Sequence, residues 1–192
     1  MPRPKTYDVQ AVLDKATEVF WKKGYDGAAL EDIICEASFN RHSLYQAFGN
    51  KKGLFLKALE NYDRTFREGI GKELEAETAG LDTIRKLLLH RLPFDVQGKG
   101  CLMTNTINEK DAVDTPVFLV AKRFVERLEE ALDHCIRKAQ EKGEIPAHKD
   151  ARSLARFVTL VLQGIGTMSK VGYTETTGKE VVDHVLNFLT QP

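Results

Sequence analysis

Two short helical segments joined by a three-residue turn constrain the fold of this chain most. Residues 30–37 and 41–48 each have the apolar spacing of a helix, and Ser38, Phe39 and Asn40 join them. Asn40 can cap the second segment, because an asparagine side chain at that position accepts a hydrogen bond from a free backbone amide. Two helices joined by so short a turn predict a helix-turn-helix.

Positive charge is concentrated in the same part of the chain. The 192 residues have a formal net charge of +0 at pH 7, yet residues 37–59 contain four cations and no Asp or Glu. These cations are Arg41, Lys51, Lys52 and Lys57. The neutral total argues against a general polyanion binder, whereas a local cationic segment favours a surface that meets phosphates.

The second helix of such a motif lies in the DNA major groove, so its polar residues are the predicted DNA contacts. They are Arg41, His42, Ser43, Tyr45 and Gln46, with Lys51 at the start of the next helix. Arg41 can donate to guanine or phosphate, Gln46 can recognise adenine, and Tyr45 can donate to a phosphate. Lys51 adds charge at a helix N-terminus, which already attracts anions. The alternative interpretation is a solvated polar face of an ordinary helical bundle.

Helical periodicity continues along the whole chain and strand-like alternation is absent, so the predicted class is all-α. The first helix carries Val12, Ala16 and Phe20 on one face and is expected to end at Gly24. The other predicted helices are 51–69, 82–92, 101–109, a long helix from Pro116 towards Gly143, one capped by Asp150, and one opened by the sequence Thr177-Gly-Lys-Glu180.

Residues 9–56 resemble the N-terminal domain of the TetR family of transcriptional regulators. The matching residues are Ala16, Phe20, Gly24-Tyr25, Asp32-Ile33, Ala37, Leu44-Tyr45, Phe48, Lys51 and Leu54. The resemblance implies about nine helices, with a helix-turn-helix domain over 1–50, a connecting helix over 51–69, and a ligand-binding and dimerisation domain over 70–192. It also implies a homodimer formed by the last two helices, a double-stranded DNA operator with two half-sites, and release of a repressor by a small-molecule effector.

The chain departs from the family pattern at three places. Ala28 and Ala29 replace the usual Thr or Ser at the start of the second helix, so we expect Gly27 to cap it instead. Ser38 replaces a glycine in the turn, where a left-handed backbone would cost roughly 1 kcal/mol. His42 occupies a position often filled by glycine, and its ring is expected to alter base preference or the approach of the helix to DNA.

The effector pocket is expected in the C-terminal domain, although the same residue types are common in plain cores. The candidate contacts are Phe94, Cys101, Met103, Asn105, Phe118, Phe124 and Phe157. Gly164 and Gly166 lack the remainder of a nucleotide-binding loop, so they are interpreted as places of close helix approach.

Cys101 allows two interpretations. It follows Lys99 and Gly100 near a helix start, where a thiol pKa is lowered, and Gly100-Cys101-Leu102 is similar to a segment in a TetR subgroup that includes electrophile and redox sensors. One alternative is therefore a redox-sensing repressor, and the other is a buried inert thiol. Cys35 and Cys135 are expected in the core.

Other classes of protein find little support in the sequence. The five histidines show no metal-binding spacing and no nucleophile or Walker motif is present, so we expect no catalytic residue, metal or cofactor. No apolar run is long enough for a membrane span, and three scattered cysteines indicate a reducing, cytoplasmic location. A helical interaction module that does not bind DNA stays open as an alternative.

Overall fold

The computed structural model describes residues 8–192 except 38, 91, 93–98 and 110–114. Within these residues every regular element is helical, which confirms the all-α class. The elements are α1 (Val9–Gly27), α2 (Leu30–Glu36), α3 (Arg41–Phe48), α4 (Lys51–Phe66), a π-helical turn (Arg67–Gly71), α5 (Lys72–Leu74), α6 (Leu81–His90), α7 (Leu102–Asn108), α8 (Thr115–Glu141), α9 (Ala151–Met168), a 3-10 turn (Ser169–Val171) and α10 (Glu175–Thr190). No described helix is long and apolar enough to cross a bilayer.

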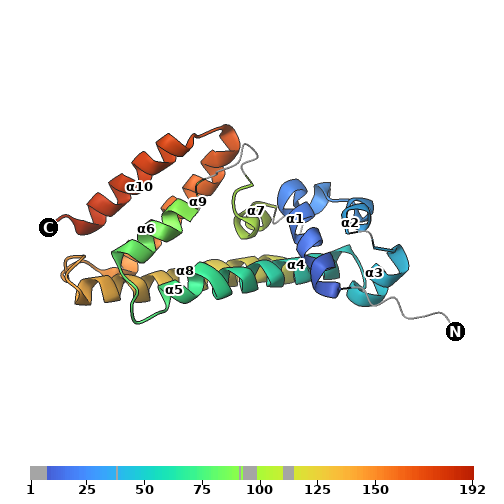
Figure 1. Cartoon of the computed structure of the whole chain (residues 1–192), viewed down its shortest axis with the longest axis horizontal. Helices are drawn as coiled ribbons and strands as arrows, with labels where there is room; N and C mark the ends of the chain where they lie inside the picture. Colours follow the sequence, from blue (N-terminus) through green and yellow to red (C-terminus); the bar gives the residue numbers. More distant parts are fainter. Residues whose placement is uncertain (1–7, 38, 91, 93–98, 110–114) are drawn as a thin grey trace.

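The helices form an elongated molecule with α1, α2 and α3 at one end and α10 at the other (Figure 1). Helices α4 and α8 run side by side between the two ends. One apolar cluster holds α1 to α4 together through Phe20, Ile33, Leu44 and Phe55, all at most 1% exposed. A second cluster joins α6, α8, α9 and α10.

The N-terminal core extends well beyond the helix-turn-helix. Cys101, Leu102 and Met103 at the start of α7 belong to the same cluster as Phe20, and so does Phe124 on α8. The small domain formed by α1, α2 and α3 is therefore packed onto α7 and α8, and is not connected to the rest of the molecule by α4 alone. Any shift of α7 or α8 is expected to reach the small domain through these contacts.

The regular part of the first helix stops at Gly24, as expected, and one further helical turn follows within α1. Gly24 has φ +72° and ψ 178°, which kinks the helix before a final turn to Gly27. An alanine here would be strained, and its Cβ would lie 2.4 Å from the Glu109 carboxylate. Gly24 is therefore needed both for the kink and for the approach of Glu109.

Two predicted caps are wrong and two are confirmed. Helix α2 is preceded by Ala29 and not Gly27, and the Asp32 carboxylate accepts from the Ala29 amide at 3.1 Å. The final helix begins earlier than predicted, because Thr174 accepts from the Thr177 amide at 3.2 Å. As predicted, Asn40 caps α3 by accepting from Ser43 N at 2.7 Å, and Asp150 accepts from Ser153 N at 2.6 Å.

Cys35 is exposed, so its predicted place in the core is wrong. Helix α2 has only seven residues, and Ile33 is its fully buried residue. A residue two positions further along is rotated by about 200° and faces solvent. Cys135 does lie in the core at 0% exposure, as predicted.

Candidate functional site

Helix α3 exposes polar side chains on one face and buries apolar side chains on the other. Leu44 is fully buried beneath it, whereas Arg41, His42 and Gln46 are exposed and Tyr45 is 42% exposed. The C-terminal end of α3 is packed closely against α4, because a Cβ on Gly53 would lie 2.1 Å from the Phe48 carbonyl oxygen. Contact with α4 and burial of Leu44 in the apolar cluster thus fix the direction in which α3 points.

Ser43 lies apart from the other candidate contacts of α3. It is only 7% exposed, and its backbone amide donates to the Asn40 cap. Its side chain lies on the flank of α3 that packs towards the domain core, next to Leu44. The exposed part of the candidate DNA surface therefore consists of Arg41, His42, Tyr45 and Gln46.

The two charged candidate contacts have partners within the protein. The Arg41 guanidinium forms an ion pair with Glu31 of α2. The Lys51 ammonium donates to the Asp26 carbonyl oxygen at 3.3 Å and lies 4.7 Å from the centre of the Tyr25 ring.

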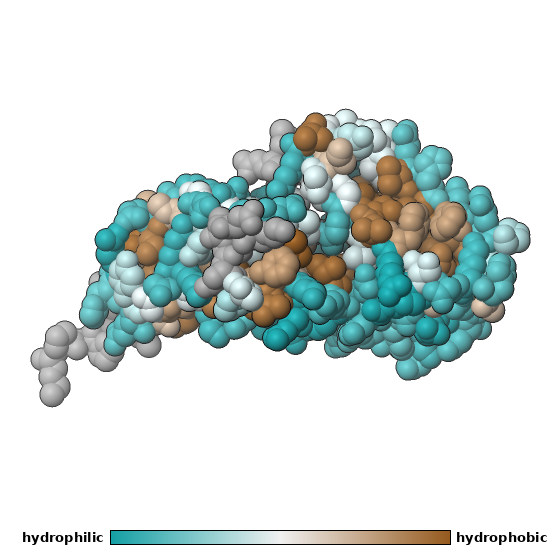
Figure 2. Space-filling model, turned by 180° about the vertical axis from the view of Figure 1, so that it is seen from behind, coloured by the Kyte–Doolittle hydropathy of each residue, from teal (hydrophilic) through white to brown (hydrophobic). Residues whose placement is uncertain are grey.

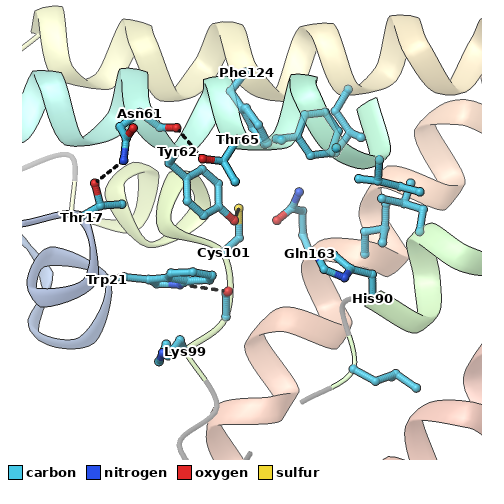
Figure 3. Close-up of a pocket in the computed structure, with 18 of the residues that line it drawn as sticks. Thr17, Trp21, Asn61, Tyr62, Thr65, His90, Lys99, Cys101, Phe124 and Gln163 are labelled. Carbon is cyan, nitrogen blue, oxygen red and sulfur yellow. Dashed lines mark hydrogen bonds between the residues drawn. The ribbon is translucent and has the colours of Figure 1, made fainter. Parts of the chain in front are cut away.

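A cavity of about 1010 Å³ lies between the small domain and the rest of the molecule. Trp21, Tyr62, Cys101 and Gln163 project into it from α1, α4, the start of α7 and α9 (Figure 3). Much of the remaining wall is apolar, from Phe66, Leu87, Leu92, Phe124, Leu128 and Leu162. A wall of this kind suits a small, mostly apolar molecule that makes a few polar contacts.

Hydrogen bonds fix the polar groups of the wall. The Trp21 indole donates to the Gly100 carbonyl oxygen at 3.1 Å, and the Tyr62 hydroxyl donates to the Cys101 sulfur at 3.7 Å. The Thr104 hydroxyl donates to the side-chain oxygen of Gln163. The other polar atom of the Gln163 amide is left for a molecule in the cavity.

An ion pair closes one side of the cavity. The Lys99 ammonium lies 2.5 Å from a carboxylate oxygen of Glu18, and Lys22 lies 3.3 Å from the same oxygen. Burial alone would raise the pKa of Glu18, but the hydrogen bonds and charges of Lys99 and Lys22 outweigh it and lower the pKa below its ordinary value. The pair joins α1 to the segment that leads into α7.

The cavity includes some of the candidate effector contacts and excludes others. Cys101, at 3% exposure, and Phe124 line it. Met103 is fully buried behind it, Asn105 donates to the Lys99 carbonyl oxygen at 3.0 Å, and Phe157 packs on Phe188 with ring centres 4.9 Å apart. Phe118 is half-buried on α8 outside the wall, and Phe94 falls outside the described residues.

Sequence reasoning missed the contribution of the small domain to this wall. Asp14, Thr17, Glu18 and Trp21 of α1 line the cavity, although the pocket was expected in the C-terminal domain alone. One signal was available, because Trp21 is the chain's only tryptophan and directly follows the core residue Phe20. A large ring beside an apolar stripe often provides contact area beyond that stripe. Among the described residues no group of His, Cys, Asp or Glu is arranged to hold a metal ion.

Comparison with known proteins gives a consistent result for both halves of the chain. Residues 12–58 match the model of bacterial regulatory proteins of the tetR family, and residues 80–185 match the tetracyclin repressor-like C-terminal domain. The repressor ComR of Escherichia coli is 30% identical over 176 residues, which cover 88% of this chain and 83% of ComR. The HTH-type regulator YezE of Bacillus subtilis is 29% identical over 89% of this chain and 90% of YezE.

Solved structures of TetR family regulators match this chain over nearly its whole length. A cysteine mutant of the TetR family regulator CifR in complex with operator DNA superposes with a TM-score of 0.80 at 26% identity, covering 96% of this chain and 98% of CifR. The reduced form of E. coli NemR has a TM-score of 0.82 at 16% identity, and the match covers 95% of this chain and 97% of the NemR chain. This match shows similarity of fold alone.

Proposed function

Since this chain belongs to the TetR family of bacterial transcriptional regulators, we propose that it is a dimeric repressor that binds an operator through α3 and releases it when a molecule enters the cavity. The observation that carries the release mechanism is the position of Trp21. It lines the cavity and also belongs to α1 of the helix-turn-helix domain. An occupant of the cavity therefore contacts the DNA-binding domain directly.

Operator binding is assigned to the exposed residues of α3 and to Lys51. Arg41 and Gln46 are placed to recognise bases, and Tyr45 and Lys51 to contact phosphates. Ser43 is left out of this set because it is buried. The test is a gel shift at fixed salt with the DNA upstream of this gene, comparing wild type with Tyr45→Ala and Arg41→Ala.

The two variants are expected to differ in their pattern of loss. Arg41→Ala is expected to cost about 1–3 kcal/mol on the operator and to relax specificity at one base position. An equal loss from Arg41→Ala on every duplex would contradict base recognition. Retention of the specific shift by both variants would favour a helical module that does not use α3 to bind DNA.

Dimerisation is assigned to α9 and α10 because this part of the described surface is unusually apolar. Leu160 on α9 is 72% exposed, Phe188 on α10 is 49% exposed, and a Cβ on Gly164 would meet no atom within 4 Å. Figure 2 shows apolar side chains gathered on the half of the molecule that carries these helices. Exposed apolar patches of this kind mark protein interfaces.

Sedimentation of a charged variant tests the interface. Leu160→Glu is expected to convert a dimer to a monomer without loss of helix content, because Leu160 is mostly solvated within one protomer. Leu119→Glu on α8 is the matched control, since that leucine is also exposed, at 38%. A Leu160→Glu protein that stays dimeric would overturn this assignment.

The effector proposed for the cavity is an amphipathic molecule with an aromatic or alicyclic body. Trp21, Tyr62 and Phe124 provide the apolar surface, and the remaining polar atom of the Gln163 amide can form a hydrogen bond. Since Trp21 is the only tryptophan, its fluorescence reports occupancy of the cavity directly. Small aromatic and aliphatic compounds are added to the protein, and their binding is followed by the fluorescence of Trp21. Compounds that bind are then tested for displacement of the operator.

The matched variants for this titration are Phe124→Ala, within the wall, and Leu119→Ala, outside it. Only Phe124→Ala is expected to weaken binding. Compounds that change Trp21 fluorescence but never displace the operator would contradict ligand release.

Cys101 supports a second candidate function, the sensing of oxidants or electrophiles. Its sulfur faces the cavity beside the Tyr62 hydroxyl (Figure 3), so a reactive molecule that enters the cavity would meet it. Because Cys35 is exposed, the test needs the Cys35→Ser background. In that background, an alkylating reagent is expected to release the operator, and Cys101→Ser is expected to abolish the response. An unchanged response would identify Cys101 as a structural thiol.

A further inference from the structure

We propose that the effector of the cavity is uncharged, and that Glu18 is the specificity-determining residue that excludes anions. The inference rests on the proposed role of the cavity as the effector site, and it names the chemical class that this site accepts. Glu18 and Lys99 both line the cavity, and their carboxylate and ammonium groups lie 2.5 Å apart. Their side chains are only 32% and 21% exposed, so this pair belongs to the cavity wall and not to the outer surface.

Lys99 lies beside the aromatic surface that an effector would cover. Its ammonium is 5.5 Å from the centre of the Trp21 ring, and both side chains face the cavity (Figure 3). An ammonium without a partner at this place would attract the carboxylate, sulfonate or phosphate of a ligand. Burial raises the pKa of Glu18, but the hydrogen bonds and charges of Lys99 and Lys22 outweigh burial and lower it. The Glu18 carboxylate is therefore ionised at neutral pH and neutralises Lys99.

The other charged side chains of the described wall also have partners within the protein. The Glu73 carboxylate and the Lys86 ammonium lie 3.7 Å apart. The Asp14 carboxylate accepts hydrogen bonds from Gln10 at 2.8 Å and from Asn61 at 2.9 Å. With histidine counted as neutral, the described wall carries three carboxylates and two ammonium groups. This excess of one negative charge further disfavours an anion in the cavity.

The cost of removing a charge from water decides between ionic and neutral ligands. An ion that enters a partly buried site loses hydration, and only an opposite charge or several hydrogen bonds offset that loss. In the wall as the structure describes it, each lysine has a carboxylate partner and each carboxylate has donors. An ionic ligand would therefore stay unpaired or break an existing pair. A neutral polar group avoids this cost, and one polar atom of the Gln163 amide is left to bind it.

Three pyrene compounds that share one aromatic body and differ in charge test this inference. They are the neutral pyrenemethanol, the anion pyrenecarboxylate and the cation pyrenemethylamine. Pyrene absorbs where tryptophan emits, and Trp21 is the only tryptophan, so pyrene emission excited through Trp21 reports a bound compound. The proteins are wild type, Glu18→Gln and, as the matched control, Glu60→Gln. Glu60 also pairs with a lysine, Lys57 at 2.6 Å, but both residues lie outside the described wall.

Wild type is expected to bind pyrenemethanol about tenfold or more tighter than either ion, because only the ions lose hydration without gaining a partner. Glu18→Gln leaves Lys99 without its carboxylate, so this variant should bind pyrenecarboxylate about tenfold more tightly than wild type does. The same variant should bind pyrenemethylamine more weakly and pyrenemethanol with unchanged affinity. Glu60→Gln should change none of the three affinities. Shifts of opposite sign for the two ions distinguish a change of charge from a general loosening of the fold.

Phe124→Ala, with its helix content verified by circular dichroism, separates failure of this inference from failure of the proposed cavity. If Phe124→Ala weakens binding but wild type binds an ion as tightly as the alcohol, the cavity is a ligand site and the inference is overturned. An equal response of pyrenecarboxylate binding to Glu18→Gln and Glu60→Gln would overturn the role of Glu18. If no compound binds, or if Phe124→Ala leaves binding unchanged, the cavity is rejected as the effector site and the inference with it.

Discussion

The Glu109 carboxylate accepts a hydrogen bond from the Tyr25 backbone amide at 2.8 Å, and so joins α7 to the kink of α1. Gly24 makes room for it, and Cys101 at the other end of α7 lines the cavity. One short helix therefore connects the cavity wall with the point where α1 turns towards α2.

Glu109→Ala is expected to lower the free energy of unfolding by about 1–3 kcal/mol, because it leaves a partly buried amide without its charged acceptor. Glu109→Gln keeps an acceptor oxygen and should lose less. Chemical denaturation measures the stability, and hydrogen exchange of the Tyr25 amide reports the contact itself. Unchanged exchange at Tyr25 in Glu109→Ala would contradict the role of this bond.

Asn61 on α4 is expected to be among the polar residues whose loss lowers stability most. Its amide nitrogen donates to Asp14 at 2.9 Å and to Thr17 at 3.2 Å, and its oxygen accepts from Gln10 and Arg64, each at 2.7 Å. Asn61→Ala should cost about 2–4 kcal/mol, because the side chain is 5% exposed and its partners lose their bonds together. Asn108→Ala, at an exposed position on α7, should stay within about 0.5 kcal/mol of wild type.

The pair between Glu18 and Lys99 predicts a pH dependence of stability. The pKa of Glu18 in the folded protein is lowered from its ordinary value of 4.5, so the pair contributes above pH 4.5 and is lost as pH falls through the folded pKa. Glu18→Gln should therefore be less stable than wild type at pH 7, by about 1 kcal/mol or less, because water still reaches this partly buried pair. The difference in unfolding free energy between wild type and Glu18→Gln should become smaller as the pH falls below 4.5. A gap that widens at low pH would contradict the direction of this shift.

Two of the three thiols, Cys35 and Cys135, are expected to react at rates set by their exposure. Cys35 is exposed and should be labelled first in the native protein. Burial raises the pKa of Cys135 to about 12, so this thiol is protonated at neutral pH and should react only on unfolding. Mass spectrometry of a timed alkylation measures the order. Labelling of Cys135 in the native state as fast as Cys35 would be inconsistent with the packing of α8.

Lys51→Ala should weaken binding to all duplexes by a similar factor, because its ammonium is placed for a phosphate rather than a base. The slope of log affinity against log salt should decrease by about one unit per protomer. Lys72→Ala on α5 removes the same charge outside α3 and outside the two proposed dimer helices, and should change neither quantity. A loss confined to one DNA sequence would assign Lys51 to base recognition instead.

The exposed polar face of α3, which we propose as the DNA surface, was predictable from sequence because it depends on local order. The spacing of Ile33, Leu44 and Phe48 sets the faces of two short helices, and Asn40 fixes where the second begins. Arg41, Tyr45 and Gln46 then fall on the outer face by helical periodicity alone. The ion pair between Arg41 and Glu31 depends on how α2 crosses α3, which periodicity does not give.

The cavity could be located only from the tertiary structure, because its wall combines residues distant in the chain. Trp21, Tyr62, Cys101 and Gln163 belong to four helices whose mutual angles no local pattern specifies. The same holds for Glu109, whose role arises only where α7 meets the kink at Gly24. The sequence by itself determined the helices, their buried faces and the family. The packing of those helices decided which polar residues meet, because such contacts depend on three-dimensional distance and not on separation along the chain.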